Sequence, residues 1–267
     1  MLIKGDYHVH SPYCPHGTTD PLRMYIEKAI EKNLSEISFT EHAPLPKNFE
    51  DPTPDKDCGM TFEQTDNYIH AVQELKKEYE DVINIKVGLE VDFIEGYEEE
   101  TTELLNTYGP YLDDSILSVH LLKAPTSKYV CLDYSSDMFG EIVELFGSLD
   151  QVYQKYYDTV TMSILSNLGP FKPNRIGHLT LIEKFKHRYP TSQNYQTTIL
   201  SLLDLIKEYQ MSLDVNTAGL FKEECQTIYP PLPIIKIAQQ KEIPLYPGSD
   251  SHSAATVGRA FDRLANL

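Results

Sequence analysis

The sequence predicts an α/β fold in which strands and helices alternate around a largely parallel sheet. Short apolar runs rich in β-branched residues are each followed by a longer amphipathic segment, the pattern of repeated strand–helix units. Seven such runs are present, over residues 3–8, 36–40, 83–91, 115–120, 175–178, 211–215 and 243–247. No Gly-, Ser- or Pro-rich linker and no internal repeat divides the 267 residues, so we expect a single domain over residues 1–267.

Amphipathic segments predict the helices. The first is expected over residues 21–32, with Thr19 or Asp20 as its N-cap and Pro21 at its first helical position. The acidic run 98–100 falls in the first turn of a later helix, where it complements the helix dipole. The other helices are expected over residues 62–79, 97–108, 139–168, 195–209, 233–241 and 254–264. The Pro-, Asp- and Lys-rich stretch 44–59 is expected to be a long loop that covers or lines a site.

Composition indicates an ordinary globular protein. The chain is 41% hydrophobic and 24% charged, and no apolar run approaches the roughly 20 residues that span a bilayer. The N-terminal segment leaves no room for the apolar part of a signal peptide, so we expect a cytoplasmic protein without a membrane association. The cysteines are widely spaced and form no Cys-x-x-Cys pair, which predicts reduced thiols rather than a disulfide framework or a zinc ribbon.

The net charge argues against nucleic acid as a partner. With 23 basic and 40 acidic residues the formal charge is −17, which repels a polyanion over most of the surface. A small anionic substrate remains compatible, because bound divalent cations invert the field locally. Charge therefore limits the size of the substrate and not its sign. The sequence makes no prediction about the oligomeric state.

The opening motif His8-x-His10 places two imidazoles at the end of the first predicted strand. Residues two apart on a strand project to the same side, so both can reach one metal ion. Asp250-x-His252 repeats this spacing after the last predicted strand. An isolated motif of this kind is more often a solvated or packed pair than a ligand pair, so its meaning depends on the rest of the chain.

The other histidines follow a pattern along the chain. Seven of the nine histidines, with Glu90 and Asp250, lie at the end of a predicted strand or in the loop after it. In a parallel β/α barrel these ends meet on one face, where side chains from several strands can share metal ions. Besides the two motifs above, the residues concerned are His16, His42, Glu90, His120 and His178. By contrast, His70 and His187 fall elsewhere and are expected to be structural or exposed.

In combination these motifs resemble the PHP (polymerase and histidinol phosphatase) family of metal-dependent phosphoesterases, and within it the histidinol-phosphate phosphatases. The resemblance covers essentially the whole chain and implies a distorted seven-stranded (β/α)7 TIM-like barrel, the PHP fold. The matching segments are His8-x-His10, Cys14-Pro15-His16-Gly17, Thr40-Glu41-His42, Gly88-Leu89-Glu90, Ser118-Val119-His120, Gly177-His178 and Ser249-Asp250-x-His252.

The resemblance implies three divalent metal ions per chain, with Glu90 bridging the first two. Imidazole and carboxylate ligands suit zinc, iron or manganese, and the sequence does not choose among them. The first ion would be held by His8, His10, Glu90 and Asp250, the second by Glu90, His120 and His178, and the third by His16, His42 and His252.

The implied activity is hydrolysis of L-histidinol phosphate to L-histidinol and phosphate in histidine biosynthesis. A hydroxide bridging two ions would attack phosphorus, and Asp250 or a metal-bound water would protonate the leaving group. One alternative is another PHP phosphoesterase that acts on a different small phosphomonoester or on a nucleotide. Another is a non-catalytic metal-binding module, against which the complete ligand set argues.

Two basic residues are candidates for binding the phosphate of the substrate. Arg175, three residues before His178, is the first candidate for the phosphate because a guanidinium contacts two phosphate oxygens, and Lys123 is the second. Each could instead be a rim charge or a salt-bridge partner.

Two carboxylates next to the ligand strands are further candidates for the site. Glu41 and Asp92 could form an acidic wall for the substrate's amine and imidazole, or could orient a metal-bound histidine. Arg259, on a predicted helix, is expected to be structural.

Overall fold

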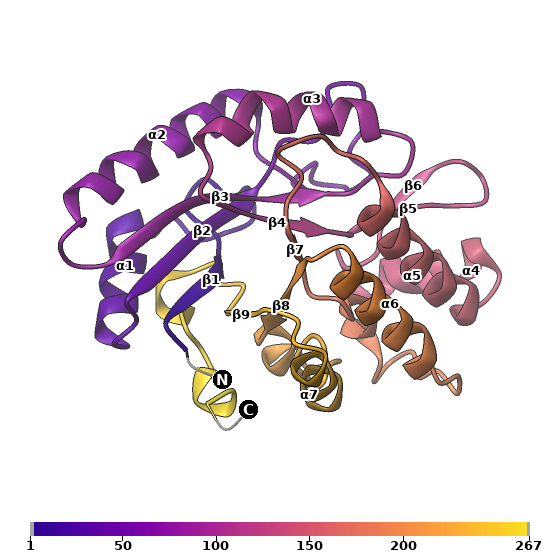
Figure 1. The fold of residues 1–267 in the computed structure, drawn as a ribbon. Coiled ribbons are helices and arrows are strands. Elements are labelled where there is room, and N and C mark those ends of the chain that lie inside the picture. Colours follow the sequence, from indigo (N-terminus) through magenta and orange to yellow (C-terminus); the bar gives the residue numbers. More distant parts are fainter. Residues whose placement is uncertain (1–2, 266–267) are drawn as a thin grey trace.

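A computed structural model describes residues 3–265, so the four terminal residues of the domain predicted over 1–267 lie outside it. Its main feature is a seven-stranded sheet that curves into a nearly closed barrel, as predicted (Figure 1). All neighbouring strands are parallel, and their order in the sheet follows the chain. The strands are β1 (Gly5–Val9), β2 (Glu36–His42), β3 (Asn84–Asp92), β4 (Asp114–Ser118), β7 (Arg175–Ile176), β8 (Ser212–Asn216) and β9 (Leu245–Gly248).

The first and last strands meet at the seam of the barrel. Val9 forms a parallel bridge with Ser251, and the backbone N–H of Asp250 donates to the carbonyl of His8 at 2.8 Å. Below this point the buried Asp6 carboxylate accepts from the backbone N–H of Ser249 at 2.9 Å. In Figure 1 the indigo β1 accordingly lies beside the yellow C-terminal segment. Both ends of the chain therefore contribute to one edge of the barrel.

Helices cover the outside of the barrel, and most predicted helices are confirmed to within a few residues. Each buries an apolar face; in α1, for example, Leu22, Tyr25, Ile26 and Ala29 are buried. The acidic run Glu98–Glu100 does lie in the first turn of its helix. The helices are α1 (Leu22–Glu31), α2 (Phe62–Glu78), α3 (Glu98–Tyr108), α4 (Ser136–Phe146), α5 (Leu149–Leu165), α6 (Gln196–Glu208) and α7 (Leu232–Gln240).

The predicted start of α1 is wrong in detail. Pro21 is the N-cap, without a side-chain cap, and the helix begins at Leu22. The Asp20 carboxylate instead accepts from Thr18 Oγ1 at 2.8 Å and from the backbone N–H of Ala254, far away in the sequence, at 2.9 Å. A contact between distant segments thus replaces the local cap.

The helix predicted over residues 139–168 is in fact two helices. Gly147 ends α4 with a φ of +87°, a conformation that glycine adopts without strain, and Ser148 caps α5 by accepting from the N–H of Gln151. The helix predicted over 254–264 is also wrong. That segment contains only the 3-10 turns η4 (Ala254–Thr256) and η5 (Phe261–Arg263), because Gly258 and Ala260 adopt positive φ between them.

A small second core lies beside the barrel, under the predicted loop 44–59. That loop contains no helix or strand, and its Phe49 packs with Ile94, Leu121 and Cys131. The last two belong to an antiparallel hairpin, β5 (Leu121–Lys123) and β6 (Tyr129–Cys131), which the sequence did not predict. Over residues 3–265 no helix is both long and apolar enough to cross a membrane.

Candidate metal centre

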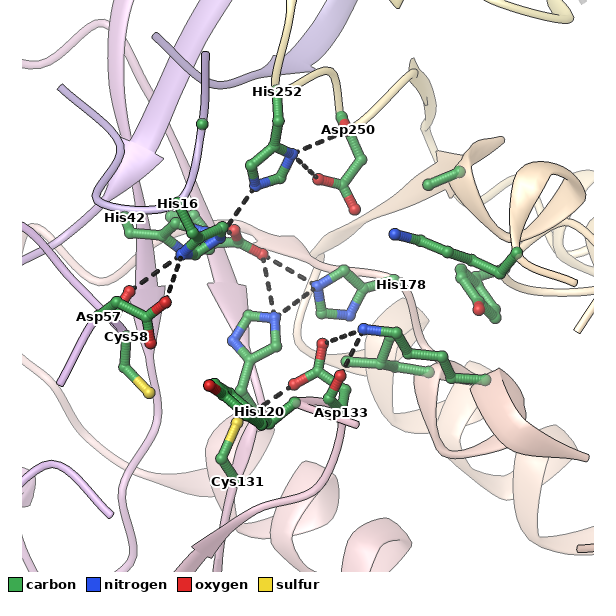
Figure 2. Close-up of a pocket in the computed structure, with 18 of the residues that line it drawn as sticks. His16, His42, Asp57, Cys58, His120, Cys131, Asp133, His178, Asp250 and His252 are labelled. Carbon is green, nitrogen blue, oxygen red and sulfur yellow. Dashed lines mark hydrogen bonds and ion pairs between the residues drawn. The ribbon is translucent and has the colours of Figure 1, made fainter. Parts of the chain in front are cut away.

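The predicted ligands gather at the carboxyl ends of the strands, around a cavity of about 600 Å³. Figure 2 shows the side chains of His16, His42, His120, His178 and His252 around this cavity, with Asp250 beside His252. His8 and His10 lie beneath it, fully buried. All nine residues predicted to bind metal are therefore in one place, although six strand ends far apart in the sequence supply them. His70 and His187 are exposed elsewhere, as predicted.

Glu90 lies at the centre of this group, and its two oxygens face different histidines. Oε2 is 3.3 Å from His8 Nε2 and 3.5 Å from His10 Nε2. Oε1 is 2.9 Å from His178 Nε2 and 3.8 Å from His120 Nε2. This arrangement is the one required of a carboxylate that bridges two ions, one on each side.

The third predicted group is formed by side chains nearer the surface. His16 Nε2 and His252 Nε2 are 3.2 Å apart, while the ring centre of His42 is 5.0 Å from that of His16. The Nδ1 of His16 donates to the carbonyl of Asp57 and that of His252 to the carbonyl of Asp250. The two Nε2 atoms therefore face each other. Two imidazole nitrogens at this distance need a cation between them, either a proton or a metal ion.

Carboxylates fix the orientation of three of the buried histidines. When Nδ1 donates to a carboxylate, Nε2 is left as the atom that faces the cavity or Glu90, which is the usual support of a metal-bound imidazole. The pairs are His8 with Asp214 at 2.9 Å, His10 with Glu41 at 3.0 Å and His120 with Asp92 at 2.8 Å.

Several buried ring nitrogens have no hydrogen-bond partner among the described residues. They are the Nε2 atoms of His8, His10 and His42 and the Nδ1 of His178. An unpaired buried polar atom is costly, so a cluster of them needs an explanation. Metal ions supply one, because the donors are imidazole and carboxylate, the set that suits zinc, iron or manganese.

Cys14 also lies within ligand distance of His10, His42 and His252. In the metal-free protein, burial and the charge of Glu41 raise the pKa of its thiol well above 9. We keep the predicted ligand set of imidazole and carboxylate groups, to which Cys14 does not belong.

The charges of the cluster favour cations. Burial alone would raise the pKa of Glu90, but the positive charges of His8 and His120 hold it well below 4.5. In the same way His8 and His10 keep Asp250 ionised. Burial and the charge of His10 lower the pKa of His42 and of His252 well below 6.5. These two rings are thus neutral and able to donate a lone pair.

The prediction that Arg175 binds phosphate is wrong. Its side chain is buried, and Nη2 donates to the carbonyl of Tyr7 and to Asp114 Oδ2, both at 2.8 Å. The guanidinium also stacks near Tyr246, 5.1 Å from the ring centre. Arg175 begins a strand whose carboxyl end carries the ligand His178, so it belongs to the opposite end of the barrel.

The other two predicted substrate contacts also need correction. Glu41 is fully buried and uses both oxygens on other groups, Oε1 on His10 and Oε2 on the N–H and hydroxyl of Ser11. It therefore orients a histidine, the alternative role considered for it. Lys123 lies in the hairpin near Tyr129 and is not among the residues that line the cavity.

Three cations that were not predicted line the cavity, namely Lys184, Lys222 and Arg259. Arg259 donates from Nε to the carbonyl of Ser249 at 3.0 Å and from Nη2 to the carbonyl of Asp250 at 3.2 Å. Sequence analysis missed Arg259 because it placed this residue on a helix. The available signal was its position in the segment after the last strand, on the face of the barrel where the ligands lie.

Comparison with known proteins agrees with the geometry. The PHP domain model matches residues 6–218. The histidinol-phosphatase of Bacillus subtilis (strain 168) is 47% identical over 263 residues, which cover 98% of each chain. The probable histidinol-phosphatase of Deinococcus radiodurans is 31% identical, over 96% of this chain and 89% of its own length.

Solved structures share the fold. The putative histidinol phosphatase hisK from Listeria monocytogenes has a TM-score of 0.92 at 36% identity, over 97% of this chain and 99% of that one. The histidinol phosphate phosphatase of Lactococcus lactis, crystallised with Zn, L-histidinol and phosphate, has a TM-score of 0.67 at 19% identity, over 95% and 88%. The second likeness concerns the fold alone. From its sequence, its barrel and its relatives, this chain belongs to the PHP domain family.

Proposed function

We propose that this chain is a histidinol-phosphate phosphatase, which hydrolyses L-histidinol phosphate to L-histidinol and phosphate. The observation that carries the proposal is the convergence of all nine ligand residues on one cavity, in a chain 47% identical over its length to a histidinol-phosphatase. The cavity of about 600 Å³ has room for a small phosphomonoester.

The proposed metal site has three positions. His8, His10, Glu90 and Asp250 would hold one ion, Glu90, His120 and His178 a second, and His16, His42 and His252 a third. When bound, the ions would supply a water nucleophile of lowered pKa and positive charge against the phosphate oxygens. Zinc is the ion to test first, and iron or manganese would suit the same donors.

The chain's own cations would bind the phosphate. Lys222 has no ion-pair partner within the described part of the chain, and burial together with the charge of Lys184 lowers the pKa of its amine. Arg259 is held by two carbonyl groups, which leaves Nη1 free for the cavity. A fixed guanidinium and a mobile ammonium suit a phosphate dianion.

Carboxylates line another part of the same cavity and would face the cationic half of the substrate. Asp57 comes from the loop 44–59, and Asp133 follows β6. Asp133 is paired with Lys184 at 2.9 Å, and that charge holds the pKa of its carboxyl well below 3.8. The less neutralised Asp57 is therefore the better candidate for the substrate's ammonium or imidazolium group.

The net charge and the cysteines support a small substrate and a cytoplasmic location. A small phosphomonoester is a better partner than nucleic acid because the formal charge is −17. A cytoplasmic location is supported by the cysteines, since Cys14, Cys58, Cys131 and Cys225 are all free thiols.

Phosphate release from histidinol phosphate tests the proposal directly. The protein stripped of metal and reloaded with zinc should hydrolyse histidinol phosphate far faster than p-nitrophenyl phosphate. His8→Ala should abolish turnover, while the matched control His187→Ala, at an exposed histidine outside the site, should leave it unchanged. Equal rates on both substrates would reject the histidinol phosphate assignment and favour a broader phosphomonoesterase.

A further inference from the structure

Unlike most of the other proposed ligands, His16 is oriented by a backbone carbonyl from a loop that is distant in the sequence. It is the most exposed of them, with 38% of its side chain accessible, and lies in the loop after β1. His8, His10 and His120 are oriented by buried carboxylates, whereas His16 Nδ1 donates to the backbone carbonyl of Asp57 at 3.0 Å. The orientation of its Nε2 therefore depends on where the loop 44–59 places one carbonyl group.

Asp51 fixes that part of the loop. Its carboxylate accepts from the backbone N–H of Thr53 at 2.8 Å, from Thr53 Oγ1 at 2.7 Å and from the backbone N–H of Cys58 at 3.0 Å. The Thr53 hydroxyl in turn accepts from the N–H of Asp57 at 3.3 Å. Asp51 thus binds the residue after Asp57 directly and holds Asp57 itself through Thr53.

The rest of the loop is anchored to the neighbouring hairpin. The ring of Phe49 packs against Tyr97 at 5.1 Å and Tyr129 at 4.9 Å between ring centres. The hydroxyl of Tyr134, which follows β6, donates to the carboxylate of Asp55. The loop is therefore attached at both sides of the turn that carries the Asp57 carbonyl. Asp51 is the group that shapes this turn.

We propose that Asp51 is a positioning residue for the third metal ion. By holding the turn from Thr53 to Cys58, it aims the Asp57 carbonyl at His16 Nδ1 and so presents His16 Nε2 toward His252 and His42. The inference rests on the proposed function in one respect, the assignment of an ion to His16. Removal of an outer partner of a metal-bound histidine usually weakens metal binding about 10- to 100-fold.

Metal binding to Asp51→Ala tests the inference. The purified variant is stripped, reloaded with three equivalents of zinc per chain and measured by elemental analysis and by competition with a chelator. We expect one ion fewer per chain than in the wild type, and a third site weakened about 10- to 100-fold while the two tighter sites are unchanged. Excess zinc should restore the third ion and with it the activity. A merely structural defect would not be confined to one ion.

Three further variants make the result unambiguous. Glu50→Ala, at an exposed carboxylate in the same loop, should bind zinc like the wild type. Thr53→Val keeps the shape of the side chain but removes its hydroxyl, and should weaken the third ion even if Asp51→Ala does not fold. His16→Ala shows the full loss. If Asp51→Ala and Thr53→Val both bind all ions as tightly as the wild type, the inference is overturned. If His16→Ala loses no ion, the proposed third site fails as well.

Discussion

The roles of Glu90 and of the histidines around it become clear when the directions of their lone pairs are compared. In His8, His10 and His120 one ring nitrogen donates to a carboxylate and the other faces the cluster. In His8, for example, Nδ1 donates to Asp214 and Nε2 faces Glu90. Sequence analysis could predict which residues these are, because few side chains bind metals and their positions at strand ends are regular. It could not predict their outer partners, such as Asp214, because those depend on three-dimensional packing.

The cations proposed to bind phosphate show why the prediction failed for Arg175. Arg175 precedes His178 by three positions, and along a strand that distance leads from one end of the barrel toward the other. Sequence analysis assumed that a positive charge close to a ligand in the sequence is also close to the metal site in space. Lys222 and Arg259 reach the cavity from the segments after β8 and β9, where no local pattern marks them.

Arg175→Met should therefore destabilise the protein without changing its affinity for substrate. It removes one partner of the ion pair with Asp114, whose carboxylate is 18% exposed and keeps the hydroxyl of Ser38 as a donor. We therefore expect a loss at the lower end of the about 3–5 kcal/mol that is typical when a buried pair is broken. Urea denaturation should show the loss, while KM measured at a temperature where the variant is folded should stay at the wild-type value. A raised KM with unchanged stability would restore the phosphate-binding role.

Lys222→Met is the matched experiment at the proposed phosphate site. Stability should change little, because the ammonium has no protein partner to lose among the described residues. KM should rise about tenfold or more, as expected for one charge-assisted hydrogen bond of about 1.5–3 kcal/mol. Wild-type kinetics in this variant would show that Lys222 does not bind the phosphate.

At the scale of elements, the strands were easier to predict than the breaks between helices. Buried strands are continuous apolar runs, so all seven were found. The helices α4 and α5 were predicted as a single helix because their apolar spacing continues across Gly147 and Ser148. A single glycine inside a helical pattern does not by itself mark the end of a helix. The hairpin β5–β6 was missed because each of its strands has only three residues.

Gly147→Ala tests the explanation of this break. Gly147 has a φ of +87°, and a Cβ there is strained whatever the surrounding space. We expect a loss of about 1 kcal/mol or more in the free energy of unfolding, measured by urea denaturation. Gly140→Ala is not a suitable control because its Cβ would meet the hydroxyl of Tyr189 at 2.5 Å. An unchanged or increased stability of Gly147→Ala would show that the break has another cause.

At the scale of the whole molecule, binding of metal should stabilise the fold. The proposed ligands come from strands all around the barrel and from both sides of its seam, so an ion bound to the native state alone shifts the unfolding equilibrium. Without metal, the neighbouring carboxylates overcome the effect of burial and raise the pKa of His8 and His120 well above 6.5 and that of His10 to about 9. Protons therefore occupy the cluster at neutral pH.

The raised pKa values of these histidines determine how the stability of the protein changes with pH. A group whose pKa is raised on folding stabilises the metal-free protein below pH 6.5, and this contribution is lost as pH rises toward about 9. Zinc must displace these protons, so its stabilising effect should grow over the same range. Thermal midpoints of stripped and zinc-loaded protein should thus diverge between about pH 6 and about pH 8.5. A constant difference would contradict the assignment of these histidines.

The seam between β1 and the segment after β9 also sets when the site can form during biosynthesis. His8 and His10 leave the ribosome before Asp250 and His252, and the whole barrel lies between the two pairs in the sequence. The first proposed ion therefore has only part of its ligands until the last strand of the barrel has been translated. A nascent chain can close its first strands early, but its metal centre is completed only after the last strand has been made, so metal loading reports that the whole barrel is present.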